Sequence, residues 1–244
     1  MKKILILSML GMWAVVAGII VISLIITPPR NETKTIDQYV KVMNDYIDSQ
    51  PIDVDAVDDS SDNGKYIKEI AVYAKKVQDI RKAYNNQRRL TEVVIEAQNL
   101  GNIESIERLN DTVDELEQVT NESHRKIEEA VIAFVNNINP LEEEGVIFDK
   151  EALIKSFDDD AERRARVTQL RLALVQYYRA ILEFVESRQG YYKIDSGKII
   201  FDTERDQEYF TQLLLGLRRY GNELDDVYTK EKDKIRDSIQ RVGQ

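Results

Sequence analysis

The chain has no cysteine and a single histidine, His124. Without thiols it can form neither a disulfide nor a thiolate metal site, and Cys–His catalysis is excluded. No GxSxG accompanies the histidine, and neither a P-loop nor a GxGxxG occurs anywhere in the sequence. Nucleophilic hydrolysis, nucleotide cleavage and dinucleotide chemistry therefore lack their usual signatures. We expect no enzymatic activity and no cofactor.

A metal site is the next class that the composition disfavours. Zinc needs three or four protein ligands, and Glu128, one helical turn after His124, supplies only one more. We expect His124 on a helix surface, as at most a weak pH sensor. The stretch from Asp59 to Gly64 resembles the start of a calcium loop, but Ile70 stands where such a loop needs a bidentate Glu. A solvated linker is the simpler interpretation, and ion binding there stays open.

Positive charge is outweighed by negative charge, with 34 Lys and Arg against 44 Asp and Glu. The net charge is −10, and the only charged residues among the first 30 are Lys2, Lys3 and Arg30, so residues 31–244 carry −13. A surface this acidic repels phosphate backbones and anionic headgroups. Nucleic acid is therefore excluded as an expected partner. Carboxylates are so abundant that no pair of them stands out as the acid and base of a hydrolase.

One long apolar run contrasts with this acidity. From Ile4 to Pro29 there is no charged side chain. A helix from Ile4 to Ile26 would be about 34 Å long, enough to cross a hydrocarbon core of about 30 Å. We predict a transmembrane signal anchor over residues 4–27, preceded by a cytoplasmic stub of residues 1–3. The membrane contact is therefore a single span.

A cleaved signal peptide is the competing interpretation, since small residues precede a possible cut after Ala17. Such a cut would leave the apolar residues Gly18 to Ile26 exposed at the new terminus, so we favour retention. The short stub and the absence of cysteine favour a cytoplasmic N-terminus with the bulk of the chain outside. This predicts a single-pass membrane protein with an extracytoplasmic domain.

The rest of the chain is expected to be mainly α-helical. Residues 28–63 should form a juxtamembrane helix, capped by Thr35 with Gln38 and stopped by Pro51, and then an acidic linker. Residues 64–138 show apolar side chains at helical spacing on both sides of Gly101 and Asn102. Two long helices joined by one tight turn there, and ended by Pro140, predict an antiparallel coiled-coil hairpin within an elongated helical bundle.

Residues 139–244 are expected to form a helical unit with one small β-hairpin at about 191–202. A short helix should begin after Asp149, and a second should run from Asp160 to Gln189 and end at Gly190. The hairpin should turn through a three-residue loop, Asp195 to Gly197. VIFDKE at 146–151 and IIFDTE at 199–204 are similar, and we expect Asp149 and Asp202 each to cap the next helix.

Tyrosine is twice as frequent as phenylalanine, and six tyrosines gather around the predicted hairpin: Tyr177, Tyr178, Tyr191, Tyr192, Tyr209 and Tyr220. A tyrosine ring suits packing at a half-wet position and equally suits an interface, because it combines apolar area with a hydroxyl. Packing beneath the hairpin is the default interpretation. If a patch of this chain binds a partner, these six residues are the candidates.

The segment FVESRQGYYKIDSGKIIFDTERDQEYF resembles the YiaF-like family of bacterial envelope lipoproteins, which carry a domain of unknown function. The shared features are a long helix ending at Gln189 and Gly190, a strand pair turning at Ser196 and Gly197, and Phe201 before a polar helix start. The likeness is best over residues 165–228. It implies a bacterial envelope location, with the predicted span in the inner membrane and the bulk of the chain periplasmic or extracytoplasmic, and it implies no catalytic residue. Without a lipobox cysteine the chain has no site for a lipid anchor.

These patterns predict a membrane-tethered helical interaction or scaffold protein of the bacterial envelope. It would hold a protein partner by its long helix faces and the tyrosine-rich hairpin, and it could also form a homo-oligomer. The alternative is a ligand-sensing helical bundle. Three cytoplasmic residues cannot relay a signal, so a sensor would act through a partner membrane protein.

Overall fold

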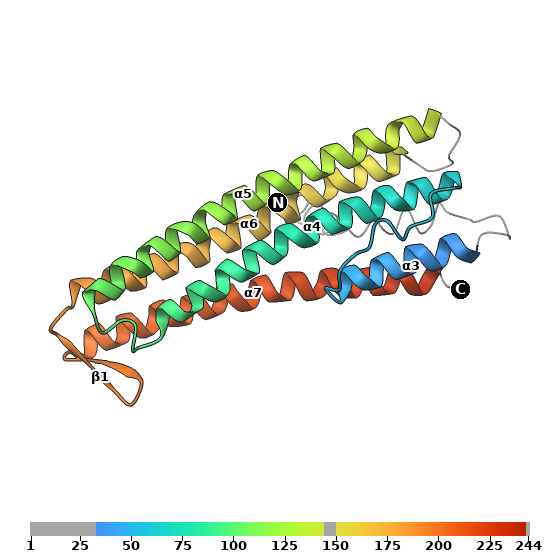
Figure 1. Cartoon of the computed structure of the whole chain (residues 1–244). Coiled ribbons are helices and arrows are strands. Elements are labelled where there is room, and N and C mark those ends of the chain that lie inside the picture. Colours follow the sequence, from blue (N-terminus) through green and yellow to red (C-terminus); the bar gives the residue numbers. More distant parts are fainter. Residues whose placement is uncertain (1–32, 144–149, 243–244) are drawn as a thin grey trace, which may run out of the picture. The chain divides into compact units, whose positions relative to one another are not determined.

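The computed structural model describes residues 33–143 and 150–242, which form five α-helices and one two-stranded antiparallel sheet (Figure 1). This confirms a mainly helical fold with a small β-hairpin. The elements are α3 (Thr33–Ile47), α4 (Asp62–Glu92), the 3₁₀ turn η1 (Val93–Ile95), α5 (Ile103–Glu143), α6 (Lys150–Ser187), β1 (Tyr192–Asp195), β2 (Lys198–Phe201) and α7 (Glu204–Val242).

The segment 4–27, predicted to be a membrane anchor, lies outside the described residues. Within 33–143 and 150–242, no helix combines the length and the apolar character that crossing a membrane requires. The anchor therefore stays a prediction.

The chain divides into two compact units. Of the described residues, unit 1 takes in 33–80, 125–143, 150–166 and 228–242, and unit 2 takes in 81–124 and 167–227. Helices α4 to α7 each contribute one segment to either unit, whereas α3 belongs to unit 1 and the β-hairpin to unit 2. Each unit therefore draws on both the predicted hairpin of 64–138 and the predicted helical unit of 139–244.

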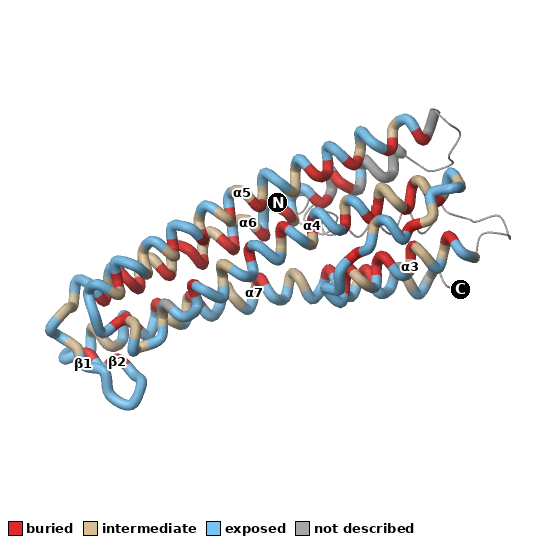
Figure 2. The backbone as a smooth tube through the Cα atoms, in the orientation of Figure 1, coloured by how far each residue is buried: buried red, intermediate tan, exposed pale blue. Residues whose placement is uncertain are grey.

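The core of unit 1 is built around α3 and a group of aromatic rings. Tyr39, Met43 and Ile47, at helical spacing on α3, are almost completely buried. Tyr73 packs against Phe134 and Phe157 with ring centroids 5.4 and 5.7 Å apart. The α3 residues and these rings belong to one hydrophobic cluster, which holds α3 within unit 1. Figure 2 shows buried positions recurring between exposed ones along the helices.

The core of unit 2 is mainly aliphatic. Leu116 on α5, Leu170 and Ile181 on α6, and Leu224 on α7 are fully buried. Aromatic side chains gather instead where α6 ends and α7 begins, close to the β-hairpin. The spacing of three and four residues between apolar positions predicted these inward faces correctly.

Several predicted helix ends are wrong. Thr35 lies buried inside α3 rather than at its start, and the helix ends at Ile47, before Pro51. Helix α4 ends at Glu92 instead of continuing to Leu100. The helix ends there because the β-branched run that begins at Val93 is unfavourable for a helix. The connection to α5 is thus ten residues long rather than one tight turn.

Two predicted helix breaks are also wrong. Helix α5 continues through Pro140 to Glu143. A proline in the last turn removes only one intrahelical hydrogen bond, so it need not end the helix. Helix α6 is one continuous helix from Lys150 to Ser187, without the predicted boundary near Asp160.

The β-hairpin is confirmed, with a tighter turn than predicted. Asp195 pairs with Lys198, so only Ser196 and Gly197 form the loop. Their φ angles are 51° and 73°, and two consecutive positive φ values are typical of a type I′ turn. Gly190, at φ 82°, lies just beyond the end of α6 as predicted, because a left-handed residue there favours glycine.

Candidate functional site

The six candidate tyrosines do not form one patch. Tyr178 is only 3% exposed and belongs to the core of unit 2. Its burial, with the nearby Glu92 carboxylate as a second cause, raises the pKa of Tyr178 to about 12. Tyr177 and Tyr220 are half-buried and pack on each other, with ring centroids 5.5 Å apart. These three are packing residues, as the default interpretation expected.

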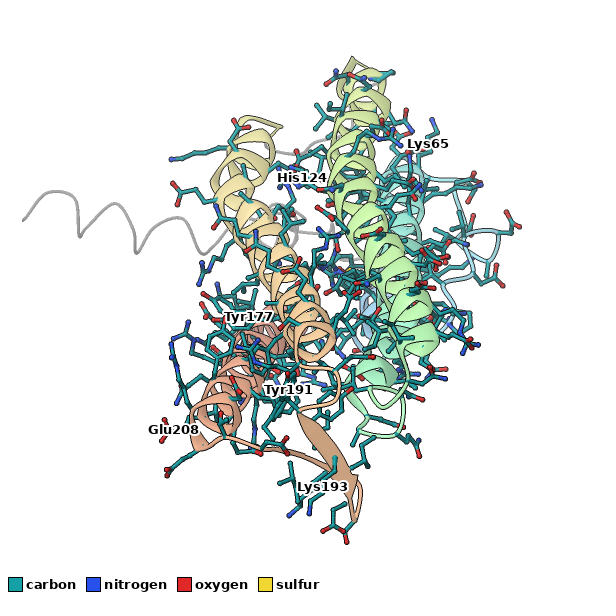
Figure 3. All side chains as sticks on the ribbon, turned by 90° about the vertical axis from the view of Figure 1, so that its left-hand side faces the viewer. Lys65, His124, Tyr177, Tyr191, Lys193 and Glu208 are labelled. Carbon is teal, nitrogen blue, oxygen red and sulfur yellow. The ribbon has the colours of Figure 1, made fainter. Side chains whose placement is uncertain are left out.

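Tyr191 and Tyr209 are different, because 63% and 52% of their surfaces are exposed. Both line an open groove formed by the end of α6, the end of β2 and the first turns of α7, which we call the hairpin groove. Its residues lie within 184–191, 200–201 and 203–212, all in unit 2. Figure 3 shows Tyr191 beside the end of α6, with Lys193 extending outward from the hairpin below it.

The floor of the hairpin groove is aromatic. Phe184 lies 4.8 Å from Tyr209 and 5.2 Å from Phe201, measured between ring centroids. Phe201 in turn lies 5.2 Å from the buried Phe210. Ile200, on the outer face of β2, remains 38% exposed beside these rings. The groove therefore offers exposed apolar side chains among polar ones, next to a packed aromatic base.

One side of the groove is polar. Arg188 Nε donates to Asp206 Oδ1 at 3.0 Å, and the Arg188 guanidinium lies 5.3 Å from the centroid of the Phe184 ring. Asp206 also accepts a hydrogen bond from the Thr203 hydroxyl at 2.9 Å. The Thr203 hydrogen bond, and after it that of Arg188, lowers the pKa of Asp206 below its usual value. Asp206 is thus an ionised carboxylate whose partners lie within the protein.

Thr203, not Asp202, caps α7. The Thr203 Oγ1 accepts a hydrogen bond from the Asp206 backbone N–H at 3.1 Å, as an N-cap side chain does, and the Thr203 hydroxyl donates to the Asp206 carboxylate. The prediction that Asp202 caps this helix is therefore wrong. Asp149, the other predicted cap, lies outside the described residues.

The hairpin that forms one wall of the groove is held at several points. The Tyr192 hydroxyl donates to the Leu100 carbonyl at 2.6 Å, and the Phe201 N–H donates to Gln207 Oε1 at 3.1 Å. Ile194 lies so close to Gly101 that a Cβ at this glycine would come within 2.6 Å of its Cδ1. The wall is therefore fixed before any partner arrives, which lowers the entropic cost of binding.

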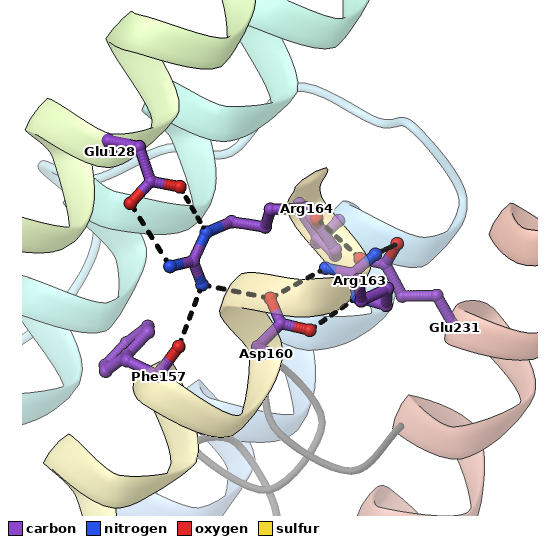
Figure 4. A network of polar contacts seen from close by, with 7 residues as sticks. Glu128, Phe157, Asp160, Arg163, Arg164 and Glu231 are labelled. Carbon is purple, nitrogen blue, oxygen red and sulfur yellow. Dashed lines mark hydrogen bonds and ion pairs between the residues drawn. The ribbon is translucent and has the colours of Figure 1, made fainter. Parts of the chain in front are cut away.

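A second cluster, in unit 1, was missed by the sequence interpretation (Figure 4). Asp160 is fully buried and accepts hydrogen bonds from Arg163 Nε at 2.5 Å and from Arg164 Nη1 at 3.2 Å. Arg164 also donates to Glu128 Oε1 at 2.6 Å, and Arg163 to Glu231 Oε2 at 2.9 Å. We call these five residues the buried ion network.

The buried ion network links the helices of unit 1. The Tyr46 hydroxyl of α3 donates to Glu231 at 3.2 Å, and Arg164 donates to the Phe157 carbonyl at 3.1 Å. Burial, and then the nearby Arg163 cation, lowers the pKa of Lys234. Because the arginines and carboxylates satisfy one another, the arrangement serves to fix helix positions rather than to receive a ligand.

The remaining candidates take structural roles. His124 Nδ1 lies 3.2 Å from the Thr168 hydroxyl and is partly buried, not fully at the surface. In the calcium-like stretch, Asp59 forms an ion pair with Lys68 at 2.5 Å, and Ser61 accepts a hydrogen bond from the Gly64 N–H at 3.0 Å. Among the residues described, no three or more His, Asp or Glu side chains are placed to hold a metal ion.

Comparison with known proteins adds no assignment to these sites. No family model, no curated protein and no solved structure matches the chain. The resemblance of residues 165–228 to the YiaF-like family therefore stays a prediction, and function has to be argued from the sites themselves.

Proposed function

We propose that the chain is a membrane-tethered helical protein of the bacterial envelope that binds a protein partner through the hairpin groove and has no catalytic activity. The observation that carries this proposal is the exposed pair Tyr191 and Tyr209 beside Ile200. Large apolar side chains set in a groove and surrounded by polar residues are typical of a protein interface.

The supporting aromatic base favours binding further. Tyrosine contributes a large rigid contact area at a low cost in side-chain entropy, and it is enriched at interface centres. The Phe184 ring behind Tyr209 and the Tyr192 hydrogen bond to Leu100 fix the surface in one shape. A preformed surface of this kind needs little rearrangement on association.

Binding is a better explanation of the hairpin groove than catalysis. The only histidine of the chain, His124, does not line the groove. Asp206 is held by Thr203 and Arg188, and its lowered pKa makes it a poor general base. Ser187 lines the groove, but its hydroxyl donates to the Phe184 carbonyl at 2.8 Å.

The tether rests on the apolar segment 4–27 and on the helix that comes after it. The described chain begins at α3, whose residues Tyr39 and Met43 are buried in the core of unit 1. A membrane anchor in that segment would be followed closely by a packed helix rather than by a long flexible linker. The absence of cysteine favours an extracytoplasmic location for both units.

Fusions to the C-terminus test the tether and its direction. Alkaline phosphatase, active only outside the cytoplasm, should be active there, and a green fluorescent protein that folds only in the cytoplasm should stay dark. The native chain should require detergent for release from membranes and retain Met1. Release by a detergent-free wash, with a first residue beyond position 17, contradicts the tether.

Site-specific photocrosslinking in cells tests the groove. A photoreactive residue replacing Tyr191 should trap a discrete partner in stoichiometric yield. The matched control replaces Leu90, which is 60% exposed in the same unit but does not line the groove. An equal product at both positions, or none at Tyr191, contradicts a protein-binding groove.

The same experiment separates the alternatives. A product at Tyr191 with twice the mass of the chain identifies a homo-oligomer instead of a different partner. The ligand-sensing alternative predicts no protein product at Tyr191 and a large rise in melting temperature with a small molecule.

A further inference from the structure

Building on the proposed function, we infer that the hairpin groove binds a basic peptide segment of its partner. An apolar side chain of that segment contacts Tyr191, Ile200 and Tyr209, and a lysine or arginine lies beside Glu204 and Glu208. This conclusion rests on which charges at the groove already have partners.

The carboxylates that line the groove are not equivalent. Asp206 is engaged by Thr203 and Arg188. Glu204 and Glu208 are exposed, and neither forms an ion pair with any residue in the described part of the chain. They are four residues apart on α7, so they lie on one face of the helix. Figure 3 shows Glu208 extending outward from α7.

The helix itself explains only one of these two carboxylates. Glu204 lies in the first turn of α7, where the positive end of the helix dipole stabilises a negative charge. Glu208 is one turn further on, where the dipole interaction has decayed. Its charge thus has no structural role in the helix start, and it lies where a cation above the groove would reach it.

The aromatic rings reinforce the preference for a cation. Phe184, Tyr191 and Tyr209 line the groove, and ring faces attract guanidinium and ammonium groups. The molecule already uses this contact, since the Arg188 guanidinium lies over Phe184. A second arginine or lysine, brought by the partner, would find both ring faces and carboxylates.

The cations in and beside the groove oppose this preference, and they include the exposed hairpin lysines Lys193, which pairs with Ile200, and Lys198. Arg188 is paired with Asp206, so Arg205 is the cation of the lining that opposes Glu204 and Glu208. The charge of residues 31–244 is −13, and this wider field attracts a basic segment and repels an acidic one or an anionic lipid surface. Charge complementarity therefore selects a basic peptide.

Two fluorescent peptides of equal length test the inference on the full chain in detergent. Each carries one central leucine, flanked in one peptide by lysines and in the other by glutamates. The basic peptide should bind at least about tenfold more tightly, a ratio that corresponds to one close charge pair. Its affinity should fall as salt is added.

Three variants locate the binding. Glu204→Lys with Glu208→Lys should reverse the preference between the peptides, and Tyr191→Ala with Tyr209→Ala should weaken both. The matched control is Glu107→Lys, an exposed glutamate of unit 2 outside the groove. It should change either affinity by less than about twofold, because a single distant surface charge is screened by salt. Circular dichroism checks that each variant is folded.

Equal affinities for the two peptides, no binding of the basic peptide, or an unchanged preference in the double Lys variant would each overturn the inference. So would a partner trapped at Tyr191 whose crosslinked segment is acidic or uncharged. The last result leaves the proposed function intact, whereas the absence of any Tyr191 product removes the proposed function itself. The two failures are thus distinguishable.

Discussion

The two units distribute their charged and apolar side chains in opposite ways. Unit 1 buries more charge: Asp160, Arg164 and Glu231 are buried in it, whereas Arg171 is the buried charged residue among those described in unit 2. Unit 2 exposes apolar surface: of the ten large hydrophobic side chains found exposed in the described residues, eight belong to unit 2 and two, Val72 and Ile132, to unit 1.

We interpret this contrast as a difference in role between the two units. A satisfied ionic core specifies one arrangement of helices, although it contributes little net stability compared with apolar packing. Exposed aromatic and aliphatic side chains lower the solubility of a protein. They are typical of surfaces that a partner covers. Unit 1 thus fixes α3, and unit 2 is the part that, in our proposal, recognises a partner.

The largest expected effect comes from breaking the buried ion network. Asp160→Ala leaves two adjacent arginines without their shared carboxylate, and we expect a loss of about 3 kcal/mol in the free energy of unfolding. Denaturant titration measures it. The control Glu162→Ala removes an exposed carboxylate from the same helix and should cost less than about 0.5 kcal/mol. Equal losses would contradict a structural role for the network.

A high-pH experiment tests the core of unit 2. The pKa of Tyr178 is about 12 in the folded chain, against an ordinary value of about 10. Because the folded pKa is the higher one, stability is complete below pH 10 and falls as pH rises towards 12. At pH 11 the loss due to Tyr178 is about 1 kcal/mol. Tyr178→Phe should remove this part of the pH dependence, and an unchanged slope in that variant would count against a buried phenol.

Replacing Gly216 of α7 tests how closely this helix packs against the candidate residue Tyr177. A Cβ at Gly216 would overlap the Tyr177 ring, with Cε1 only 2.1 Å away. Gly216→Ala should therefore destabilise unit 2 by about 1 kcal/mol despite the better helix propensity of alanine. In a Tyr177→Ala background the same change should stabilise by up to about 1 kcal/mol. Unfolding titrations of the unchanged chain, the two single variants and the double variant measure this reversal of sign.

The smallest effect is expected at the exposed ion pairs of unit 2. Arg179 Nη2 lies 2.5 Å from Asp114 and 2.9 Å from Glu117, yet all three side chains are well solvated. Arg179→Ala should cost no more than about 0.5 kcal/mol, because surface pairs are screened and entropically costly. A loss as large as that of Asp160→Ala would remove the distinction between the buried and the exposed charges.

Apolar spacing predicted the helices but not where every helix ends. The predicted boundary near Asp160 was wrong because a charged residue interrupts the apolar pattern while still lying on the buried face of α6. The signal was present as Asp160, Arg163 and Arg164 at spacings of three and four residues. Recognising it requires Glu128 and Glu231, whose proximity is a tertiary property that no local pattern contains.

The candidate site was predicted in part. The hairpin could be predicted from β-branched and aromatic residues around a glycine turn, a local signal. The division of the six tyrosines into core, such as Tyr178, and groove, such as Tyr191, depends on which face of each helix is covered by other segments. The sequence shows that tyrosines gather around the hairpin, but only the packing of the fold shows which of them remain exposed.

Hydrogen–deuterium exchange of the full chain, with and without the partner trapped at Tyr191, tests the central assignment most directly. The account predicts slower exchange in the segments that form the hairpin groove, at the end of β2 and the first turns of α7, with no change in α4 around Leu90. Protection confined to unit 1, or to α4, would contradict the assignment of recognition to unit 2.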